Sequence, residues 1–157
     1  MKLIKTDGDQ VVFQMSKRET RMLVEVLKLY PVVPAKYQPL SKAAPEAPRA
    51  ENQRLLEEAL AEHRRENRRQ LEALLNEPNR CQENEHGFLF SFSPAQMEWL
   101  LQILNDVRVG SWLLLGCPDE KRGQRFKLNE KNSRYLFAME LGGHFQSALL
   151  EALDQRA

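Results

Sequence analysis

Three polar residues inside a long apolar segment are the first candidates for a binding site. Asn105, Asp106 and Arg108 interrupt the stretch from 97 to 116, which is otherwise rich in Leu, Val, Ile and Trp. A charge taken out of water needs an opposite charge or hydrogen bonds. Asp106 and Arg108 are two positions apart, so on a helix they point to different sides. The spacing predicts ion pairs to neighbouring helices or to a second subunit, and a ligand or partner site is the alternative.

A stripe of arginines is the second candidate. It consists of Arg64, Arg65, Arg68 and Arg69. This spacing puts all four on one side of a helix, where they can contact phosphates or other anions. Glutamates flank the stripe and weaken its positive field: Glu57, Glu58, Glu62, Glu66 and Glu72. No aromatic residue occurs between positions 38 and 87 to stack on a base. A solvated charged face is therefore favoured, with nucleic-acid contact as the alternative.

Residues that catalyse reactions or bind metals are sparse. The soft metal ligands are His63, His86, His144, Cys81 and Cys117. Their spacings do not match those of a zinc site. The chain also lacks a Gly-rich phosphate loop and a Gly-x-Ser-x-Gly motif. The sequence therefore predicts no metal, no cofactor and no enzymatic activity.

Length and composition predict one helical domain over residues 1–157. With 23 basic and 22 acidic side chains, the net charge of +1 lacks the basic excess of a DNA-coating protein. No apolar run at the start is long enough for a signal peptide. The apolar segment 97–116 contains Glu98, Asp106 and Arg108, which are costly in lipid. We expect a cytoplasmic protein without membrane contact, and two isolated cysteines fit a reducing compartment.

The hydrophobic pattern predicts a mainly α protein with a small antiparallel β-sheet, an α+β class with four main helices. Alternation over residues 2–15 around Asp7-Gly8 indicates a hairpin, and residues 87–92 indicate a further strand. Helices are expected at about 17–30, 50–76 and 94–116, and in a last segment that ends near 154. A Pro-rich internal linker from 31 to 49 joins the first two helices.

Two of these helices have distinctive patterns. The segment 50–76 has leucines at both ends and charges between them, which predicts docking at its two ends, or a break into a helical hairpin. The segment 94–116 is apolar nearly all round, which predicts a central helix buried on every side.

Gly142 and Gly143 lower the helix propensity of the last helix by roughly 1–2 kcal/mol. We expect close packing against Gly110 of the central helix to offset that cost.

Two strand–cap–helix units repeat at an offset of 77 residues. Residues 13–16 align with residues 90–93, and each ends in a serine. Glu19 and Gln96 then lie where a capping box needs them. We expect the two strands to pair in one small sheet with the helices on one face. Internal duplication explains the repeat, and so does the small number of good ways to join a strand to a helix.

The sequence also resembles a known family. Residues 99–108, the N-terminal strand with its Ser-x-x-Glu helix, and residues 135–149 resemble a bacterial family of unknown function. Its members are often encoded beside the adaptor of the Clp protease, and some are labelled transcriptional regulators. The resemblance implies a link to regulated proteolysis and implies no catalytic residue. We therefore expect a non-enzymatic protein-interaction module that can self-associate, with a nucleic-acid-associated regulator as the alternative.

Overall fold

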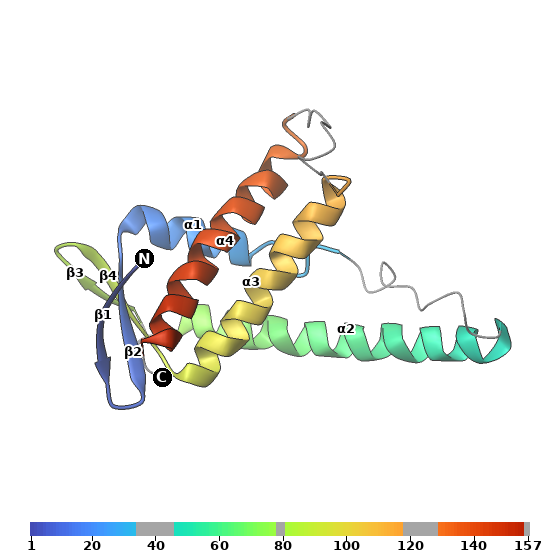
Figure 1. Cartoon of the computed structure of the whole chain (residues 1–157), viewed down its shortest axis with the longest axis horizontal. Coiled ribbons are helices and arrows are strands. Elements are labelled where there is room, and N and C mark those ends of the chain that lie inside the picture. The colour runs from blue at the N-terminus through green and yellow to red at the C-terminus, as the bar shows by residue number, and fades with distance from the viewer. Residues whose placement is uncertain (34–45, 78–80, 118–128, 156–157) are drawn as a thin grey trace.

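Four helices and one four-stranded sheet make up the part of the chain described by this computed structural model, residues 1–33, 46–77, 81–117 and 129–155. In chain order the elements are β1 (Lys2–Asp7), β2 (Gln10–Met15), α1 (Lys17–Leu27), α2 (Glu46–Asn76), β3 (Cys81–Asn84), β4 (Gly87–Phe92), α3 (Pro94–Leu114) and α4 (Ser133–Asp154). The sheet lies at one end of the molecule and the helices pack against one face of it (Figure 1). The predicted mainly helical α+β class is confirmed.

The strands lie in the order β1-β2-β4-β3, and each neighbouring pair is antiparallel. The predicted pairing of β2 with β4 is confirmed, with Phe13 opposite Phe90. The face toward the helices carries the buried side chains Val11, Phe13, Met15 and Phe92. Strand β3 is not predicted from the sequence, because Cys-Gln-Glu-Asn shows no apolar alternation. It is an edge strand that pairs with β4 alone, a position in which polar residues are tolerated.

The two hairpins of the sheet close in the same way. In the first, Asp7 lies opposite Gln10 across a two-residue turn, as the Asp-Gly pair predicts. In the second, Asn84 lies opposite Gly87. Each of these positions is 77 residues after its counterpart. The offset seen in the sequence therefore also relates the hairpins that precede the two capped helices.

Both predicted capping boxes are present. The Oγ of Ser16 accepts from the amide of Glu19 at 3.2 Å, and the Glu19 carboxylate accepts from the Ser16 amide at 2.8 Å. Ser93 and Gln96 repeat the two bonds at 3.2 and 2.9 Å at the start of α3. Each box satisfies amides that the first helical turn leaves without partners. The boxes thus fix where α1 and α3 leave the sheet.

The Met1 amino group and the capping box together give Glu19 an unusually low pKa. Partial burial alone would raise the pKa of this carboxyl. Hydrogen bonds from the Met1 amino group and from Ser16 stabilise the ionised form and lower the pKa from 4.5 to about 2. Because the folded-state pKa lies below the unfolded value, ionised Glu19 stabilises the fold above pH 4.5. That contribution is lost as the pH falls from 4.5 toward 2.

We expect Glu19→Gln to lower the free energy of unfolding by about 1 kcal/mol at neutral pH, a figure reduced because solvent screens the side chain. That side chain is 34% exposed. The difference between wild type and variant should shrink as the pH falls from 4.5 to about 2, because wild-type Glu19 then becomes protonated. Urea unfolding at stepwise lower pH measures this difference. A difference that stays constant would contradict the assigned pKa.

Helices α3 and α4 run antiparallel and pack along each other (Figure 1). At their crossing, a Cβ on Gly142 would lie 2.7 Å from Cγ of Arg108, so the glycine makes room for the arginine side chain. Gly143 faces the same side chain at an ordinary contact distance of 3.5 Å. Gly110 does not face these glycines as expected, because its Cβ would meet Val32 at 2.8 Å instead. The small residues therefore serve two separate contacts.

Helix α2 is a single helix of 31 residues, so the alternative of a helical hairpin is excluded. Asn67 and Leu71 are buried near its C-terminal end. Leu55, near the other end, keeps 50% of its surface exposed. The prediction that both ends dock is therefore wrong for the N-terminal end, which extends beyond the other helices (Figure 1). Leu56 and Leu60 there are half-buried, and sequence periodicity cannot show how far such residues are covered.

The predicted linker from 31 to 49 falls mainly on residues 34–45, which lie outside the described residues. Its last four residues, 46–49, belong to α2, so the linker was predicted too long. The sequence assigns Pro48 to the linker. A proline is nevertheless compatible with the first turn of a helix, where its missing N–H is not needed. At the N-terminal boundary of the predicted linker, Val33 is buried, so the first residues assigned to the linker pack against the protein.

Candidate protein-interaction site

The outward face of α3 changes from polar to apolar along the helix. Its first half exposes the polar residues Glu98, Gln102, Asn105 and Asp106. Its last two turns expose Val109, Trp112 and Leu113, with 48%, 40% and 37% of their surfaces accessible. Spacings of three and four residues keep these side chains on one face. An apolar stripe therefore faces solvent where a polar one is typical.

This finding corrects the prediction that the segment 94–116 is buried on every side. The inner side of α3 is buried to its end through Val107, Gly110 and Ser111. Leu114 is 37% exposed, and Phe137, near the start of α4, is 51% exposed at the same end of the helix pair. We call the five exposed residues the tip patch: Val109, Trp112, Leu113, Leu114 and Phe137.

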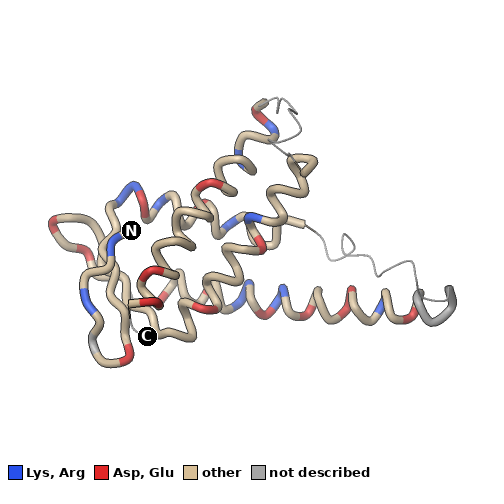
Figure 2. The backbone as a smooth tube through the Cα atoms, in the orientation of Figure 1, with Lys and Arg blue, Asp and Glu red and all other residues tan. Residues whose placement is uncertain are grey.

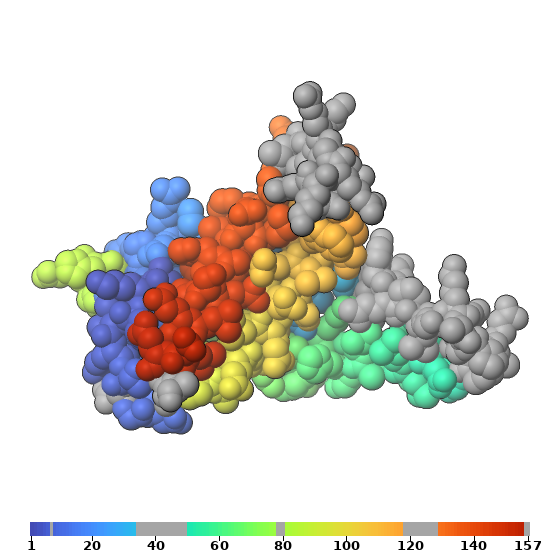
Figure 3. Space-filling model, viewed as in Figure 1, coloured from blue at the N-terminus to red at the C-terminus, as the bar shows by residue number. Residues whose placement is uncertain are grey.

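The position of the tip patch follows from the lengths of the elements. Helix α3 has 21 residues, whereas α1 has 11 and ends at Leu27. The last turns of α3 therefore extend past α1, on the side of the molecule away from the sheet (Figures 1 and 3). Apolar composition alone cannot reveal which side has a covering element.

The structure separates the three polar residues that the sequence groups together. Asn105 and Asp106 are exposed one turn before the tip patch. Arg108 lies across Gly142 and donates from Nη1 to Oε1 of Gln146 at 2.6 Å. Its partner is thus a neutral amide on α4, in place of the expected ion pair. Arg108 joins two helices, while Asn105 and Asp106 border the exposed apolar surface.

A small hollow of about 40 Å³ beside the tip patch holds three polar groups, Asp106, Arg64 and Tyr30. Asp106 is exposed on its outer side, yet the surrounding protein removes part of its water shell. This burial raises the pKa of Asp106, although Arg64 and His63 act to lower it. Burial also raises the pKa of Tyr30. The hollow is far smaller than the roughly 300 Å³ of a small-molecule site, so it is a polar seam between α2 and α3.

The arginine stripe is largely paired with glutamates. Within α2, Arg65 contacts Glu62, Arg68 contacts Glu72 at 3.4 Å, and Arg69 contacts Glu66 at 3.7 Å. Arg64 instead lines the seam, where its Nη1 is buried without a hydrogen-bond partner among the described residues. In Figure 2 acidic residues lie on both sides of the basic residues of α2. This pairing lowers the positive field that the stripe could offer to phosphates.

Asn67 joins α2 to the rest of the molecule. It is 5% exposed, its Nδ2 donates to the hydroxyl of Tyr30 at 3.0 Å, and its Oδ1 accepts from Nε1 of Trp99 at 3.0 Å. One buried amide thus satisfies the buried hydroxyl of Tyr30 and the half-buried indole N–H of Trp99. The sequence contains no signal for this role, because Asn67 lies among charged residues and looks like one more solvated position.

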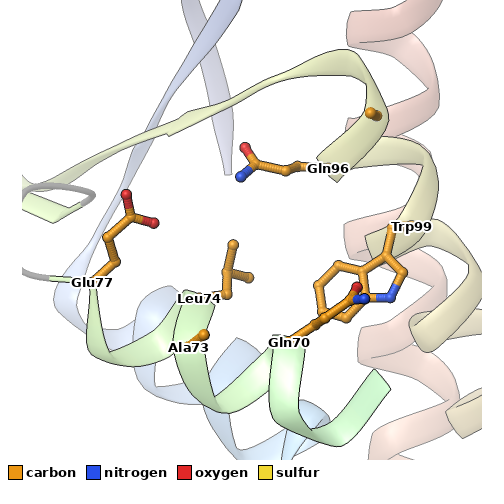
Figure 4. Close-up of a pocket in the computed structure, with 7 residues that line it drawn as sticks. Gln70, Ala73, Leu74, Glu77, Gln96 and Trp99 are labelled. Atoms are coloured by element: carbon orange, nitrogen blue, oxygen red, sulfur yellow. The ribbon is translucent and has the colours of Figure 1, made fainter. Parts of the chain in front are cut away.

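A hollow of about 530 Å³ lies between the end of α2 and the start of α3 (Figure 4). Trp99 and Leu74 supply apolar walls, and the side chains of Gln96 and Glu77 lie at its rim. Of the described residues that line it, Glu77 is the one that ionises. These lining residues do not include a nucleophile with a neighbouring base, the usual sign of covalent catalysis.

Comparisons of the chain with protein-family models, curated proteins and solved structures found no match. Within the described segments, no helix combines the length and hydropathy needed to cross a membrane. The same residues contain no group of three or more His, Cys, Asp or Glu placed to hold a metal ion. The exposed apolar end of the α3–α4 pair is thus the surface feature that calls for a functional explanation.

Proposed function

We propose that the protein is a non-enzymatic protein-interaction module and that the tip patch is its contact surface. The proposal rests on the exposure of five large apolar side chains at one end of the α3–α4 pair. Their exposed areas sum to about 400 Å², and the part from Val109, Trp112 and Leu113 shares one face of α3. Trp112 lies among aliphatic residues, the arrangement found at the centres of protein interfaces.

The partner that fits this surface is apolar and poor in charge. Residues 109–117 contain no charged side chain. Asp106 lies at the border of the patch on the same face of α3. A charge-free centre with a polar rim is typical of specific protein interfaces, in which the rim sets orientation. Asn105 and Asp106 would act as that rim.

The resemblance to the bacterial family encoded beside the Clp adaptor supports a role in regulated proteolysis. In that role the module would hold a partner protein for the protease system. The proposal places the protein in the bacterial cytoplasm, and the free thiols of Cys81 and Cys117 suit a reducing compartment. The alternative of a nucleic-acid-associated regulator has less support, because three of the four arginines are paired with glutamates.

We also propose that the chain arose by duplication of a hairpin–helix unit. One offset of 77 residues relates the two hairpin turns, the two capping serines and the positions of Phe13 and Phe90. Phe13 and Phe90 are equivalent in this alignment and lie opposite each other in the sheet. A local twofold axis through that pair would relate the two units, which accounts for their central place in one sheet.

Affinity capture from native lysate, with and without nuclease and read by mass spectrometry, tests the proposed contact surface. Trp112→Glu places a charge at the centre of the tip patch. We expect it to reduce partner recovery by at least about tenfold, because a charge buried without a partner costs several kcal/mol. Leu150→Glu is the matched control, because Leu150 is 55% exposed on α4 and lies outside the tip patch.

Protein partners that survive nuclease and are lost with Trp112→Glu alone are the expected result. Clp components among them would support the role in proteolysis. Partners that disappear with nuclease would favour the nucleic-acid alternative. Equal recovery with the Trp112 and Leu150 variants would rule out the tip patch as the contact surface.

A further inference from the structure

Helix α2 extends well beyond its contacts with the other helices. At a rise of 1.5 Å per residue its length is roughly 46 Å. Among residues 50–62, which we call the arm, no residue is buried. Isolated helical segments of this length are only marginally stable in water. A contact along the arm would therefore stabilise it.

The arm and the segment that follows it carry opposite charges. Residues 50–62 contain four glutamates and one arginine, a net charge of −3, and residues 63–69 contain four arginines and one glutamate, a net charge of +3. In Figure 2 the basic residues of α2 lie nearer the other helices and acidic residues predominate toward the free end. Two antiparallel copies of α2 would place each arm against the basic segment of the other, whereas parallel copies would oppose like charges.

The present ion pairs on α2 are easily exchanged. They join exposed residues three or four positions apart, as in the contacts of Arg54 with Glu51 at 2.7 Å and with Glu58 at 3.0 Å. Exposed pairs of this kind contribute only about 0.3–0.5 kcal/mol each. Replacing them with pairs to a second chain therefore costs little, and the gain comes from bringing two blocks of opposite charge together.

The arm also carries apolar surface suited to helix packing. Leu55 is 50% exposed, and Ala59 and Ala61 are exposed as well. Small and aliphatic residues allow two helix axes to approach closely. Two α2 helices paired over the arm and the basic segment would bury on the order of 1,200 Å² in total, the lower limit for stable protein interfaces.

We propose that the protein forms an antiparallel homodimer through α2, with the arm of each copy lying on residues 63–69 of the other. The twofold axis of this dimer crosses the helix pair near Ala61, at the boundary between the acidic and basic blocks. The contact is separate from the tip patch. The dimer therefore presents two tip patches and can bind a bivalent partner with increased avidity.

Sedimentation equilibrium of the full chain measures dimer formation, and two charge-reversal variants test the proposed pairing of the arm with the basic segment. One variant carries Glu57→Lys and Glu58→Lys in the arm, and the other carries Arg65→Glu and Arg68→Glu in the basic segment. We expect a wild-type dimer that weakens as salt is added. Each variant alone should dimerise at least about tenfold more weakly, because its arm and basic segment then carry the same sign. An equimolar mixture should recover the dimer, because opposite blocks meet again.

Three results would overturn the proposal: a wild-type chain that stays monomeric at low salt, variants that dimerise like wild type, or a mixture that remains monomeric.

Cysteine cross-linking gives a second test without charge changes, after Cys81 and Cys117 are replaced by serine. Antiparallel pairing predicts a disulfide-linked dimer for Ala61→Cys. The matched variant Gln70→Cys should not cross-link, because its two copies would be roughly 27 Å apart along the axis. Cross-linking at position 70 without cross-linking at 61 would contradict the antiparallel arrangement.

Discussion

Gly87→Ala is expected to lower the free energy of unfolding by about 3–5 kcal/mol. Gly87 begins β4 with a φ of 125°, a conformation that other residues rarely adopt. A Cβ at this position would lie 2.3 Å from the carbonyl oxygen of Met15 and 2.9 Å from Cα of Ser16. Both are backbone atoms where β2 passes into the capping box of α1. The clash can be relieved only by moving the strands apart, and urea unfolding measures the loss.

Gly8→Ala is the matched control in the other hairpin. Gly8 also has a positive φ, 58°, but a Cβ there would meet no atom within 4 Å. Its replacement should cost only the conformational penalty of about 1–2 kcal/mol. Similar losses for the two variants would show that backbone conformation alone explains both, and that the close approach of Gly87 to Met15 contributes nothing.

Asn67→Leu is expected to lower the free energy of unfolding by about 2–4 kcal/mol, because it leaves one buried and one half-buried polar group without their partner. The hydroxyl of Tyr30 and Nε1 of Trp99 each lose a 3.0 Å hydrogen bond to the Asn67 side chain. Leucine keeps the branch at Cγ but can neither donate nor accept a hydrogen bond, so both bonds of Asn67 are lost. Chemical denaturation measures the change in stability. Hydrogen exchange should increase more in α2 than in α3 when the variant is compared with wild type.

Gln70→Leu provides the comparison for this variant. Gln70 is exposed on the same helix and bonds to Glu66 at 3.2 Å. Its replacement should change the free energy of unfolding by less than about 0.5 kcal/mol. If Asn67→Leu proved as mild as Gln70→Leu, the buried amide would not be what holds α2 to the other helices.

The parts of the fold that depend on local rules could be predicted from the sequence. Asp7-Gly8 specifies a tight hairpin, and Ser16 and Ser93 specify helix starts, because each feature is decided by residues a few positions apart. The pairing of β2 with β4 followed from the alignment of two similar segments. These predictions are confirmed by the strand pairing and by the hydrogen bonds of the two caps.

The parts that depend on distant elements could not be predicted. Strand β3 exists because β4 offers it a partner, not because its polar residues favour a strand. Trp112 and Leu55 are apolar residues on helices, so periodicity predicts burial for both, yet they keep 40% and 50% of their surfaces exposed. Periodicity shows which side of a helix is apolar, whereas exposure depends on the lengths and positions of its neighbours.

At the candidate site, too, the sequence predicts local features, whereas the side chains that face solvent depend on the surrounding structure. Asn105 and Asp106 were singled out because they interrupt an apolar segment, and they do border the tip patch. Arg108 was grouped with them by sequence distance, although a helix turns it toward Gly142 and Gln146. Trp112 was treated as a core residue. The polar residues that interrupt the apolar segment thus indicate the C-terminal half of α3, and the structure identifies which side chains face solvent there.

Site-specific photo-cross-linking at position 112 is the most direct test of the claim that the tip patch contacts a protein partner. A photoreactive amino acid at position 112, where Trp112 is 40% exposed, is compared with the same amino acid at position 150, where Leu150 is 55% exposed on α4. In cells of the native host, light should link position 112 to a discrete protein partner and should yield no such product from position 150. No product from position 112, or the same products from both positions, would contradict the claim.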